Sequence, residues 1–370
     1  MTGIYEQIIN QLFRCKLDGC DRKIYHIGTK EIGKEEAINY LSRYLYVIIQ
    51  ELITDLVDTE DGVERSIRLV NAIIKKLGRE FQMEHYEDDL IDASHSILTC
   101  IIDKTACDYP DIQKYIKQIT PITTLTQSSL FTGSNYSVNM MSELKKEILS
   151  SNEVRILVSF IRQSGVNLLL SELKRLTETG RKLKIITSTY MAATEYRVIR
   201  TLAQLPNTEV KISYNSDVDR LHAKAYIFLR DTKFNTAYIG SSNISKAALT
   251  DGLEWNIKVT QVELPHIMSM VNNTFETYWE NSAFETFCPG RDDEKLKTAL
   301  GMSENQDGEI DYSVLDLMQA KEYQNDVLDK LEKERKYNNN WNNLVVAATG
   351  TGKTVIAAFD YKRFRERNKR

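Results

Sequence analysis

Short apolar segments alternate with amphipathic ones from residue 154 onward, and this alternation constrains the fold more than any other feature of the sequence. Residues 154–160, 183–188 and 210–214 are rich in β-branched side chains and bounded by turn formers, which predicts buried strands. Helical spacing covers the intervening residues 166–179 and 195–205. Strands that alternate with helices predict an α/β domain.

Three more strands are predicted at 221–229, 236–241 and 254–260, and they follow one another with little room for helices. Such closely spaced strands favour a hairpin addition, which would make the sheet mixed. A helix is expected to begin near Pro265 and to run to about Trp279. Another helix is predicted over residues 140–150, before the first strand.

The composition is that of a folded intracellular protein. The 370 residues are 42% hydrophobic and 27% charged, and the formal net charge of −4 gives no global basic footprint for nucleic acid. No apolar run approaches the roughly 18 residues that cross a bilayer, and the first residues lack a signal-peptide pattern. We therefore expect a cytoplasmic protein with no membrane partner.

Five cysteines, an odd and scattered set, argue against a disulfide framework and for reduced thiols. Cys15, Cys20 and His26 could in principle ligate zinc, but no second ligand pair follows at finger spacing. Buried structural cysteine is the simpler interpretation, and we predict no metal site.

The first part of the chain reads as helical. Apolar residues recur at three- and four-residue steps over 40–53, 61–77 and 90–102, and no catalytic constellation is found there. We predict a helical N-terminal domain over 1–125, an α/β domain over 126–290 and a charged, polar linker over 291–320. Residues 321–370 form a separate C-terminal region.

A phosphate-binding loop is predicted in that C-terminal region. A strand at 343–347 leads into a glycine-rich turn, and a helix at 355–361 follows, which is the context that such a loop requires. Backbone N–H groups around Gly350 and Gly352 would face phosphate oxygens, Lys353 would reach the β and γ phosphates, and Thr354 would hold Mg²⁺. A chance glycine-rich turn is the alternative.

The loop resembles motif I of superfamily 2 helicases, since Ala347 stands where many phosphate loops have glycine. Gln324, in a predicted helix over 323–336, resembles the adenine-reading glutamine of those motors. The resemblance implies ATP and Mg²⁺ as cofactors of the complete helicase. The second acidic motif and arginine finger that hydrolysis requires do not occur in these 370 residues, so we expect an incomplete RecA-like domain without ATPase activity.

A set of polar residues near the ends of the later strands carries the chemistry. His222 and Lys224 are two residues apart on a predicted strand, so both side chains should leave the same face. Asn243 ends the next strand after Gly240, Ser241 and Ser242, and Glu254 begins another. Four groups are sufficient for phosphodiester cleavage through a phosphohistidine without a metal. They are an imidazole nucleophile, an ammonium and an amide that bind phosphoryl oxygens, and a carboxylate that orients the imidazole. An incidental His and Lys on a surface strand is the alternative.

These residues resemble the phospholipase D superfamily, whose signature is His-x-Lys followed by Gly-Ser-x-Asn, and the resemblance covers about residues 130–285. Leu229 occupies the place of that family's usual Asp, and Asp231 lies two residues too far on. The departure favours the nuclease branch, in which a downstream glutamate, here Glu254, takes the orienting role. A second His-x-Lys is absent, so the resemblance implies a homodimer with a composite site.

The order of helical region, phospholipase D-like region and helicase motif resembles ATP-dependent type IV, modification-dependent restriction enzymes. The resemblance implies an endonuclease, a hydrolase that binds DNA and cleaves it without a metal as part of a helicase-coupled restriction-modification or phage-defence system. Two alternatives remain open: a phosphatidyl hydrolase or transferase, and a non-catalytic DNA-binding module that dimerises a helicase.

Overall fold

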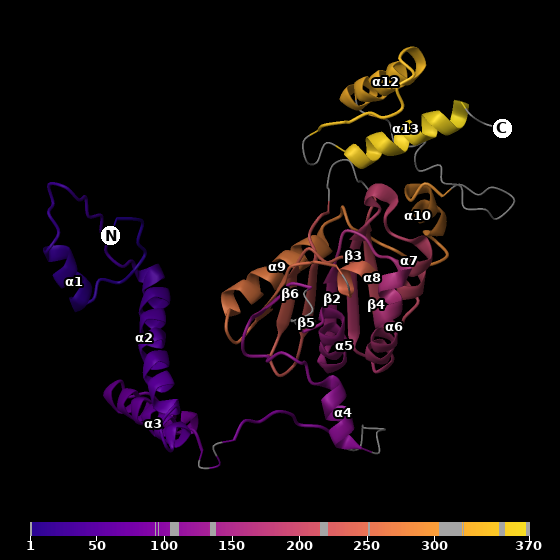
Figure 1. The fold of residues 1–370 in the computed structure, drawn as a ribbon. Helices are drawn as coiled ribbons and strands as arrows, with labels where there is room; N and C mark the ends of the chain where they lie inside the picture. The colour runs from indigo at the N-terminus through magenta and orange to yellow at the C-terminus, as the bar shows by residue number, and fades with distance from the viewer. Residues whose placement is uncertain are drawn as a thin grey trace. The chain divides into compact units, whose positions relative to one another are not determined.

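The computed structural model describes residues 2–92, 94, 96–103, 111–133, 138–214, 221–250, 252–302, 320, 322–347 and 352–367. The chain divides into two compact units, Met1–Ile102 and Asp103–Arg370, and most of their helices and strands are labelled in Figure 1. The mixed α/β class expected from the sequence is confirmed, with a helical N-terminal region before the sheet.

The first unit is helical. Its elements are α1 (Gln11–Asp18), α2 (Lys34–Val57), α3 (Gly62–Glu80) and the short 3-10 helix η1 (Tyr86–Asp89). Helices α2 and α3 confirm the predictions over 40–53 and 61–77. The predicted helix over 90–102 is wrong for the described residues of that stretch. The Asn71 side chain bonds to both backbone groups of Ile91, at 3.0 and 2.9 Å, and holds the chain extended there.

The second unit is built on an eight-stranded mixed sheet of order β1-β7-β6-β5-β2-β3-β4-β8. Its strands are β1 (Ser129–Phe131), β2 (Glu153–Leu157), β3 (Lys182–Ser188), β4 (Thr208–Ser213), β5 (Ala225–Leu229), β6 (Thr236–Gly240), β7 (Asn256–Thr260) and β8 (Glu285–Thr286). Strands β2, β3 and β4 are parallel, and all other pairings are antiparallel, so the predicted hairpin addition to a parallel core is confirmed.

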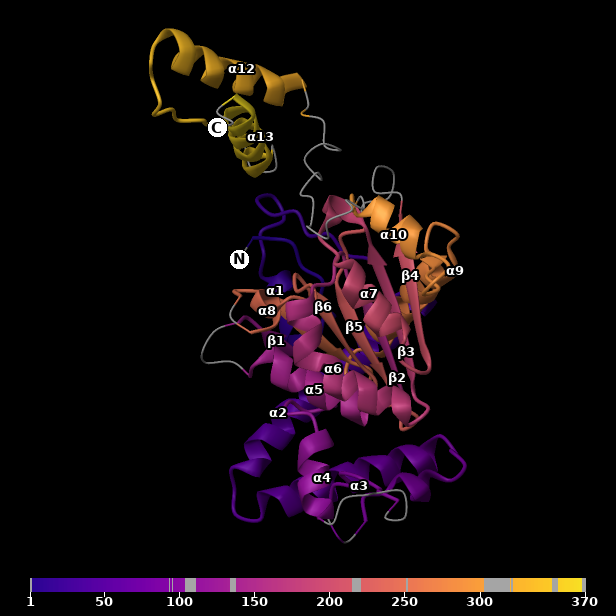
Figure 2. The same cartoon turned by 90° about the vertical axis from the view of Figure 1, so that its right-hand side faces the viewer.

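Helices cover both faces of this sheet (Figure 2). The helices of this unit are α4 (Ile112–Ile119), α5 (Met140–Ser150), α6 (Gln163–Glu178), η2 (Tyr190–Ala192), α7 (Tyr196–Ala203), α8 (Lys246–Leu249), α9 (Pro265–Glu280), α10 (Asp293–Ala299), α12 (Glu322–Tyr337) and α13 (Lys353–Arg367). Leu144 of α5, Leu169 of α6 and Val198 of α7 share one core cluster with Ile156 and Ile185. On the other face, Phe275 of α9 packs in a cluster with Leu157 and Ile186. Alternate residues of each strand therefore face opposite cores.

Several segments differ from the sequence predictions. Strands β1 and β8 were not predicted because three and two residues are too few to show a pattern. Helix α10 lies in the stretch predicted to be linker, and its Leu296 and the following Leu300 are buried in the core. Residues 343–347 form no strand, and no described segment pairs with them. A strand needs a partner for its backbone groups.

A buried network of ion pairs and hydrogen bonds joins α5 to the sheet. The carboxylates of Glu143 and Glu147 are 0% exposed, as is Lys258 of β7. The Lys258 ammonium lies 3.2 Å from Glu143 Oε1 and 2.9 Å from Glu147 Oε1. Arg230 donates to Glu147 as well, and the Tyr238 hydroxyl donates to Glu147 at 2.8 Å. Two negative and two positive groups thus balance inside the core, as buried charges require.

Candidate active site

The topology gathers the sequence-predicted residues at one end of the sheet. Because β5 runs antiparallel to β2, its first residue Ala225 is paired with Leu157, the last residue of β2. At the same end, Ala225 is paired with Ile239 of β6, and Gly240 with Asn256 at the start of β7. Segments 221–224, 241–243 and 252–255 therefore all adjoin the carboxyl end of β2, where ligands commonly bind in α/β sheets.

His222 and Lys224 lie immediately before β5, whereas the sequence placed them on the strand itself. The Lys224 ammonium lies 3.1 Å from His222 Nδ1 and donates to the His222 carbonyl at 2.6 Å. Lys224 is only 6% exposed, whereas His222 is exposed to solvent. The structure thus holds a nearly buried ammonium directly beside an accessible imidazole.

The surroundings of Lys224 disfavour its charge. Burial lowers the pKa of the Lys224 ammonium below its ordinary value of 10.5, and the attraction of Glu254 offsets this only in part. Among the described residues, no carboxylate forms an ion pair with Lys224. An ammonium held without a carboxylate partner has its charge available for an anionic ligand.

Asn243 is fixed by the backbone at the end of β2. Its Oδ1 accepts hydrogen bonds from the Ser159 and Phe160 N–H groups, at 2.9 and 3.3 Å, and the residue is 8% exposed. With Oδ1 engaged by two donors, the remaining polar atom, Nδ2, is a donor. Gly165 of α6 holds this turn closely, since a Cβ on it would lie 2.5 Å from the Ile244 carbonyl carbon. The orientation of the Asn243 amide is therefore set before any ligand arrives.

The small residues before Asn243 brace the segment that carries Glu254. A Cβ on Gly240 would lie 2.1 Å from the Trp255 carbonyl oxygen, so only glycine is accommodated without a shift. Ser241 exchanges hydrogen bonds with Trp255, each at 3.1 Å. Ser242 Oγ accepts from Asn256 Nδ2 at 2.8 Å. The glycine and serines thus hold the segment that carries Glu254 in place, and their supporting role in a catalytic site stays a prediction.

Two residues of this scaffold were missed from the sequence. Asn256 reads as an ordinary residue of a strand, yet its amide bonds the Ser242 side chain. Tyr226 donates its hydroxyl to the Ser242 carbonyl at 3.0 Å, and burial together with Glu254 raises its pKa well above the ordinary value of 10. It therefore remains a neutral donor. The sequence could have indicated Tyr226, because it lies two residues after Lys224 and its side chain should therefore leave the same face of the sheet.

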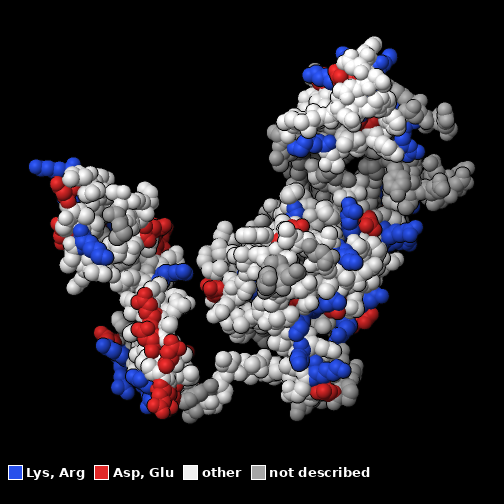
Figure 3. All heavy atoms as spheres, in the orientation of Figure 1, with Lys and Arg blue, Asp and Glu red and all other residues white. Residues whose placement is uncertain are grey.

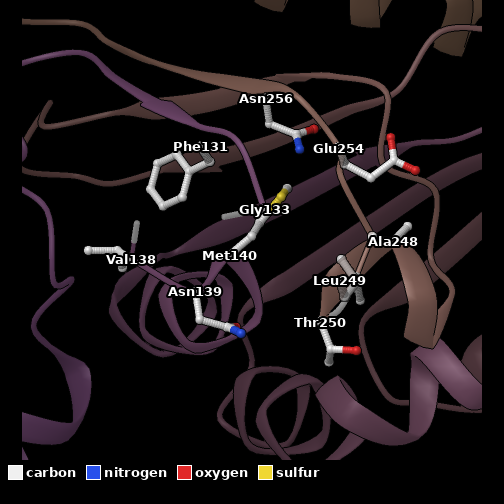
Figure 4. Close-up of a pocket in the computed structure, with 11 residues that line it drawn as sticks. Phe131, Gly133, Val138, Asn139, Met140, Ala248, Leu249, Thr250, Glu254 and Asn256 are labelled. Carbon is white, nitrogen blue, oxygen red and sulfur yellow. The ribbon is translucent and has the colours of Figure 1, made fainter. Parts of the chain in front are cut away.

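Glu254 lies on the wall of a cavity of about 220 Å³. Figure 4 shows Glu254 and Asn256 on one side of this cavity and Asn139 and Thr250 on the other. Within the described part of the chain, no hydrogen bond or ion pair joins the Glu254 carboxylate to the His222 imidazole. The influence of Glu254 on Lys224 and Tyr226 nevertheless places its charge within electrostatic reach of the site.

The C-terminal region brings some of its predicted residues together. The Gln324 amide lies against Gly352, where a Cβ would be only 2.7 Å from Gln324 Nε2, and Gly352 has a positive φ of 77°. The Lys353 ammonium donates to the Ala347 carbonyl at 3.0 Å, and Thr354 is exposed. Gly350 lies outside the described residues. Leu328 of α12 packs on Ile356 and Phe359 of α13.

Neither a metal cluster nor a membrane-spanning helix occurs among the described residues. No group of three or more His, Cys, Asp or Glu side chains lies together there as a metal site. None of the helices in the described part of the chain has the length and apolarity to span a bilayer.

Comparisons with known proteins divide the second unit in two. Residues 144–279 match the family described as "Cardiolipin synthase, PLD-like domain", and residues 317–370 match "Type III restriction enzyme, res subunit". No curated protein matches the chain.

Among solved structures, NucT from Helicobacter pylori is 22% identical and has a TM-score of 0.35, with 44% of this chain covering 99% of that one. The phospholipase D family member Nuc from Salmonella typhimurium is 18% identical, with a TM-score of 0.34 and coverages of 44% and 99%. The phosphatidylserine synthase of Haemophilus influenzae Rd KW20 is 12% identical, with a TM-score of 0.33 and coverages of 43% and 39%.

Proposed function

Residues 144–279 form a phospholipase D-like domain, which is followed by part of a type III restriction enzyme res domain, and we propose that this chain is a metal-independent DNA endonuclease. The observation that carries the proposal is the close pair of His222 and Lys224, 3.1 Å apart, at the sheet end that also holds Asn243 and Glu254. We assign the nuclease to a helicase-coupled restriction or defence enzyme.

In the first step, a ring nitrogen of His222 attacks phosphorus, a P–N bond forms and the P–O bond to one DNA strand breaks. The Lys224 ammonium and the Asn243 amide Nδ2 donate to the non-bridging oxygens, whose charge grows in the transition state. Glu254 orients the imidazole and stabilises its positive charge in the phosphohistidine. In the structure Nδ1 faces Lys224, so substrate binding would move the ammonium onto phosphate and free that nitrogen for Glu254.

The leaving oxygen needs a proton, and water must later be deprotonated to break the P–N bond. We assign both transfers to His222 of a second copy, because the chain has a single His-x-Lys motif. The active enzyme in this proposal is a homodimer whose two-fold axis passes through the site.

DNA is favoured over lipid by the region that follows the domain in the chain. The cavity beside Glu254 does not decide between the two substrates, because apolar side chains line it together with polar ones. The neighbouring match to a restriction enzyme subunit places the domain beside a region that we propose binds ATP and Mg²⁺ in the complete helicase. Gln324, Gly352, Lys353 and Thr354 would contact that nucleotide, together with Gly350.

The test is plasmid cleavage in EDTA by the full chain, by His222→Ala and by His266→Ala, in which an exposed histidine of α9 serves as the control. We expect cleavage by the original chain and by His266→Ala only. Cleavage that survives in His222→Ala would contradict the proposal. Turnover of phosphatidyl lipid without DNA cutting would support the hydrolase alternative, and DNA binding with no cutting would support the non-catalytic module.

A further inference from the structure

The first unit lacks the buried core that a helical domain needs. Of its described residues, only Gly62, Ser66 and Gly78 are buried, and none of the hydrophobic side chains there is. Helix α2 has 24 residues and not one of them is buried. Helical stability in proteins comes mainly from packing of an apolar face, so α2 requires a partner surface.

The exposed residues of α2 follow a pattern that specifies this partner. Ile38, Leu41, Leu45, Ile48 and Leu52 are spaced by three, four, three and four residues, which is the a and d stripe of a coiled coil. All five are exposed, by 76, 53, 50, 37 and 47%. A stripe of Ile and Leu at this spacing is complementary to another helix with the same stripe.

The stripe and the neighbouring Tyr44 present enough apolar area for a small dimer interface. Six large apolar side chains of α2 lie on or beside the stripe and are more than a third exposed: Ile38, Leu41, Tyr44, Leu45, Ile48 and Leu52. At roughly 80 Å² each, they present about 500 Å² per copy. Two copies would therefore bury about 1,000 Å², which is the lower end for a specific interface.

We propose that α2 pairs with α2 of a second copy of this chain. Charge favours an antiparallel pair. In the N-terminal half of α2, Lys34 and Arg43 balance Glu35 and Glu36, whereas Glu51 and Asp55 leave the C-terminal half acidic. Figure 3 shows acidic side chains running along this helix. A parallel pair would stack the two acidic halves, and an antiparallel pair sets each acidic half beside a balanced one.

This pairing does not rest on the proposed nuclease activity. If that activity also requires two copies, the α2 pair would raise the effective concentration of one catalytic domain near the other.

The test is photocross-linking of the full chain with p-benzoylphenylalanine in place of Leu52, in a refolded equal mixture of ¹⁴N and ¹⁵N chains. Mixed-isotope cross-links between residues 34–57 of two copies are expected. The control places the same group at the exposed Gln50, about 200° around the helix, where few such cross-links are expected. Same-isotope cross-links from position 52 to the sheet domain would overturn the proposal, as would the absence of cross-links.

A second variant tests the stripe itself. Leu45→Asp, combined with the Leu52 label, should lower the mixed-isotope yield at least tenfold, while Asn39→Asp, which lies off the stripe, should leave it unchanged. Far-ultraviolet circular dichroism establishes that the helices persist. An unchanged yield in Leu45→Asp would contradict the pairing. DNA cleavage is measured in a separate assay, so the cross-linking result can be interpreted even if the nuclease proposal fails.

Discussion

Two buried lysines of the same sheet domain have opposite surroundings. Lys258 of β7 is 0% exposed and bonds two buried carboxylates, Glu143 and Glu147, and the Thr123 hydroxyl. Lys224, 6% exposed before β5, bonds only to His222 within the described part of the chain, and Glu254 influences it from a greater distance. The first ammonium is fully neutralised by its neighbours, and the second is not.

We interpret this difference as one between a charge that stabilises the fold and a charge that we propose takes part in catalysis. A buried charge without a partner lowers the stability of the fold. Its presence at a sheet edge therefore indicates a role in function and not in stability. The paired lysine stabilises the position of α5, whereas we propose that the poorly paired one binds a phosphate.

The largest stability effect is expected from Lys258→Met. Removal of the ammonium leaves two buried carboxylates with Arg230 as their one remaining cation in the network, which should cost about 3–5 kcal/mol of unfolding free energy. Chemical denaturation measures it. Lys145→Met is the matched control, because Lys145 forms a looser, partly exposed pair with Glu172 at 3.6 Å and should cost less than about 1 kcal/mol. Equal losses would contradict the distinction.

Lys224→Met should change the stability of the protein little and its DNA cleavage strongly. Its unfolding free energy should stay within about 1 kcal/mol of the original, because an apolar side chain of similar length avoids desolvating a charge. DNA cleavage should fall by about 10³, because one donor to the transition-state oxygens is lost. A variant that is strongly destabilised yet cleaves DNA normally would reverse our assignment of the two lysines.

Asn243→Asp should reduce cleavage by about 10²–10³ while the domain stays folded. The new carboxylate can still accept from the Ser159 and Phe160 N–H groups, but it offers no donor and repels phosphate. Single-turnover rates measure the loss. Gln261→Glu is the control, since Gln261 lies at the other end of β7 and its side chain bonds Asn235. A normal rate in Asn243→Asp would exclude the amide from the reaction.

Alkaline pH should separate activity from stability. The pKa of Lys224 is lowered by burial, so cleavage should decline as pH rises through that value, below the ordinary 10.5. Over the same window the unfolded chain binds more protons than the folded one, so the contribution of Lys224 to stability rises with pH. Lys224→Arg should keep activity to higher pH. Identical alkaline profiles would contradict the role of the ammonium.

Lowering the pH should destabilise the buried network of charges around Glu147. Burial raises the pKa of Glu147, but Arg230 and Lys258 outweigh it and hold that pKa below the ordinary 4.5. The carboxylate therefore contributes stability that is complete above pH 4.5 and is lost as pH falls through its lowered pKa. Denaturation midpoints for the original chain and Glu147→Gln should converge toward acid pH. Parallel curves would contradict this contribution.

The sequence predicted the central strands and helices because their patterns are local. Residues 140–150 and 183–188, for example, lie within one residue of the observed α5 and β3. It also placed Asn243 at the end of a strand, since a motif and its spacing are visible without coordinates, whereas it put His222 and Lys224 on a strand that begins only at Ala225. The strand expected at 343–347 failed because pairing is a long-range property.

The buried network escaped prediction for a similar reason. Glu143 and Glu147 read as the polar side of an amphipathic helix, and nothing local connects them to Arg230 or Lys258. One signal was present: both glutamates fall beside Met140, Leu144 and Ile148, on the stripe that faces the core. The position of Glu254 relative to His222 depends on how two separate turns meet at the sheet edge, which spacing alone does not determine.

Trapping of the covalent intermediate tests the central claim most directly. The full chain is mixed with DNA in EDTA, quenched in alkaline denaturant, which preserves a phosphoramidate, and its peptides are analysed by mass spectrometry. Our account predicts a DNA phosphate bound to His222, absent from His222→Ala and from the unreacted chain. DNA cleavage without any adduct on His222, or cleavage that EDTA abolishes, would contradict it.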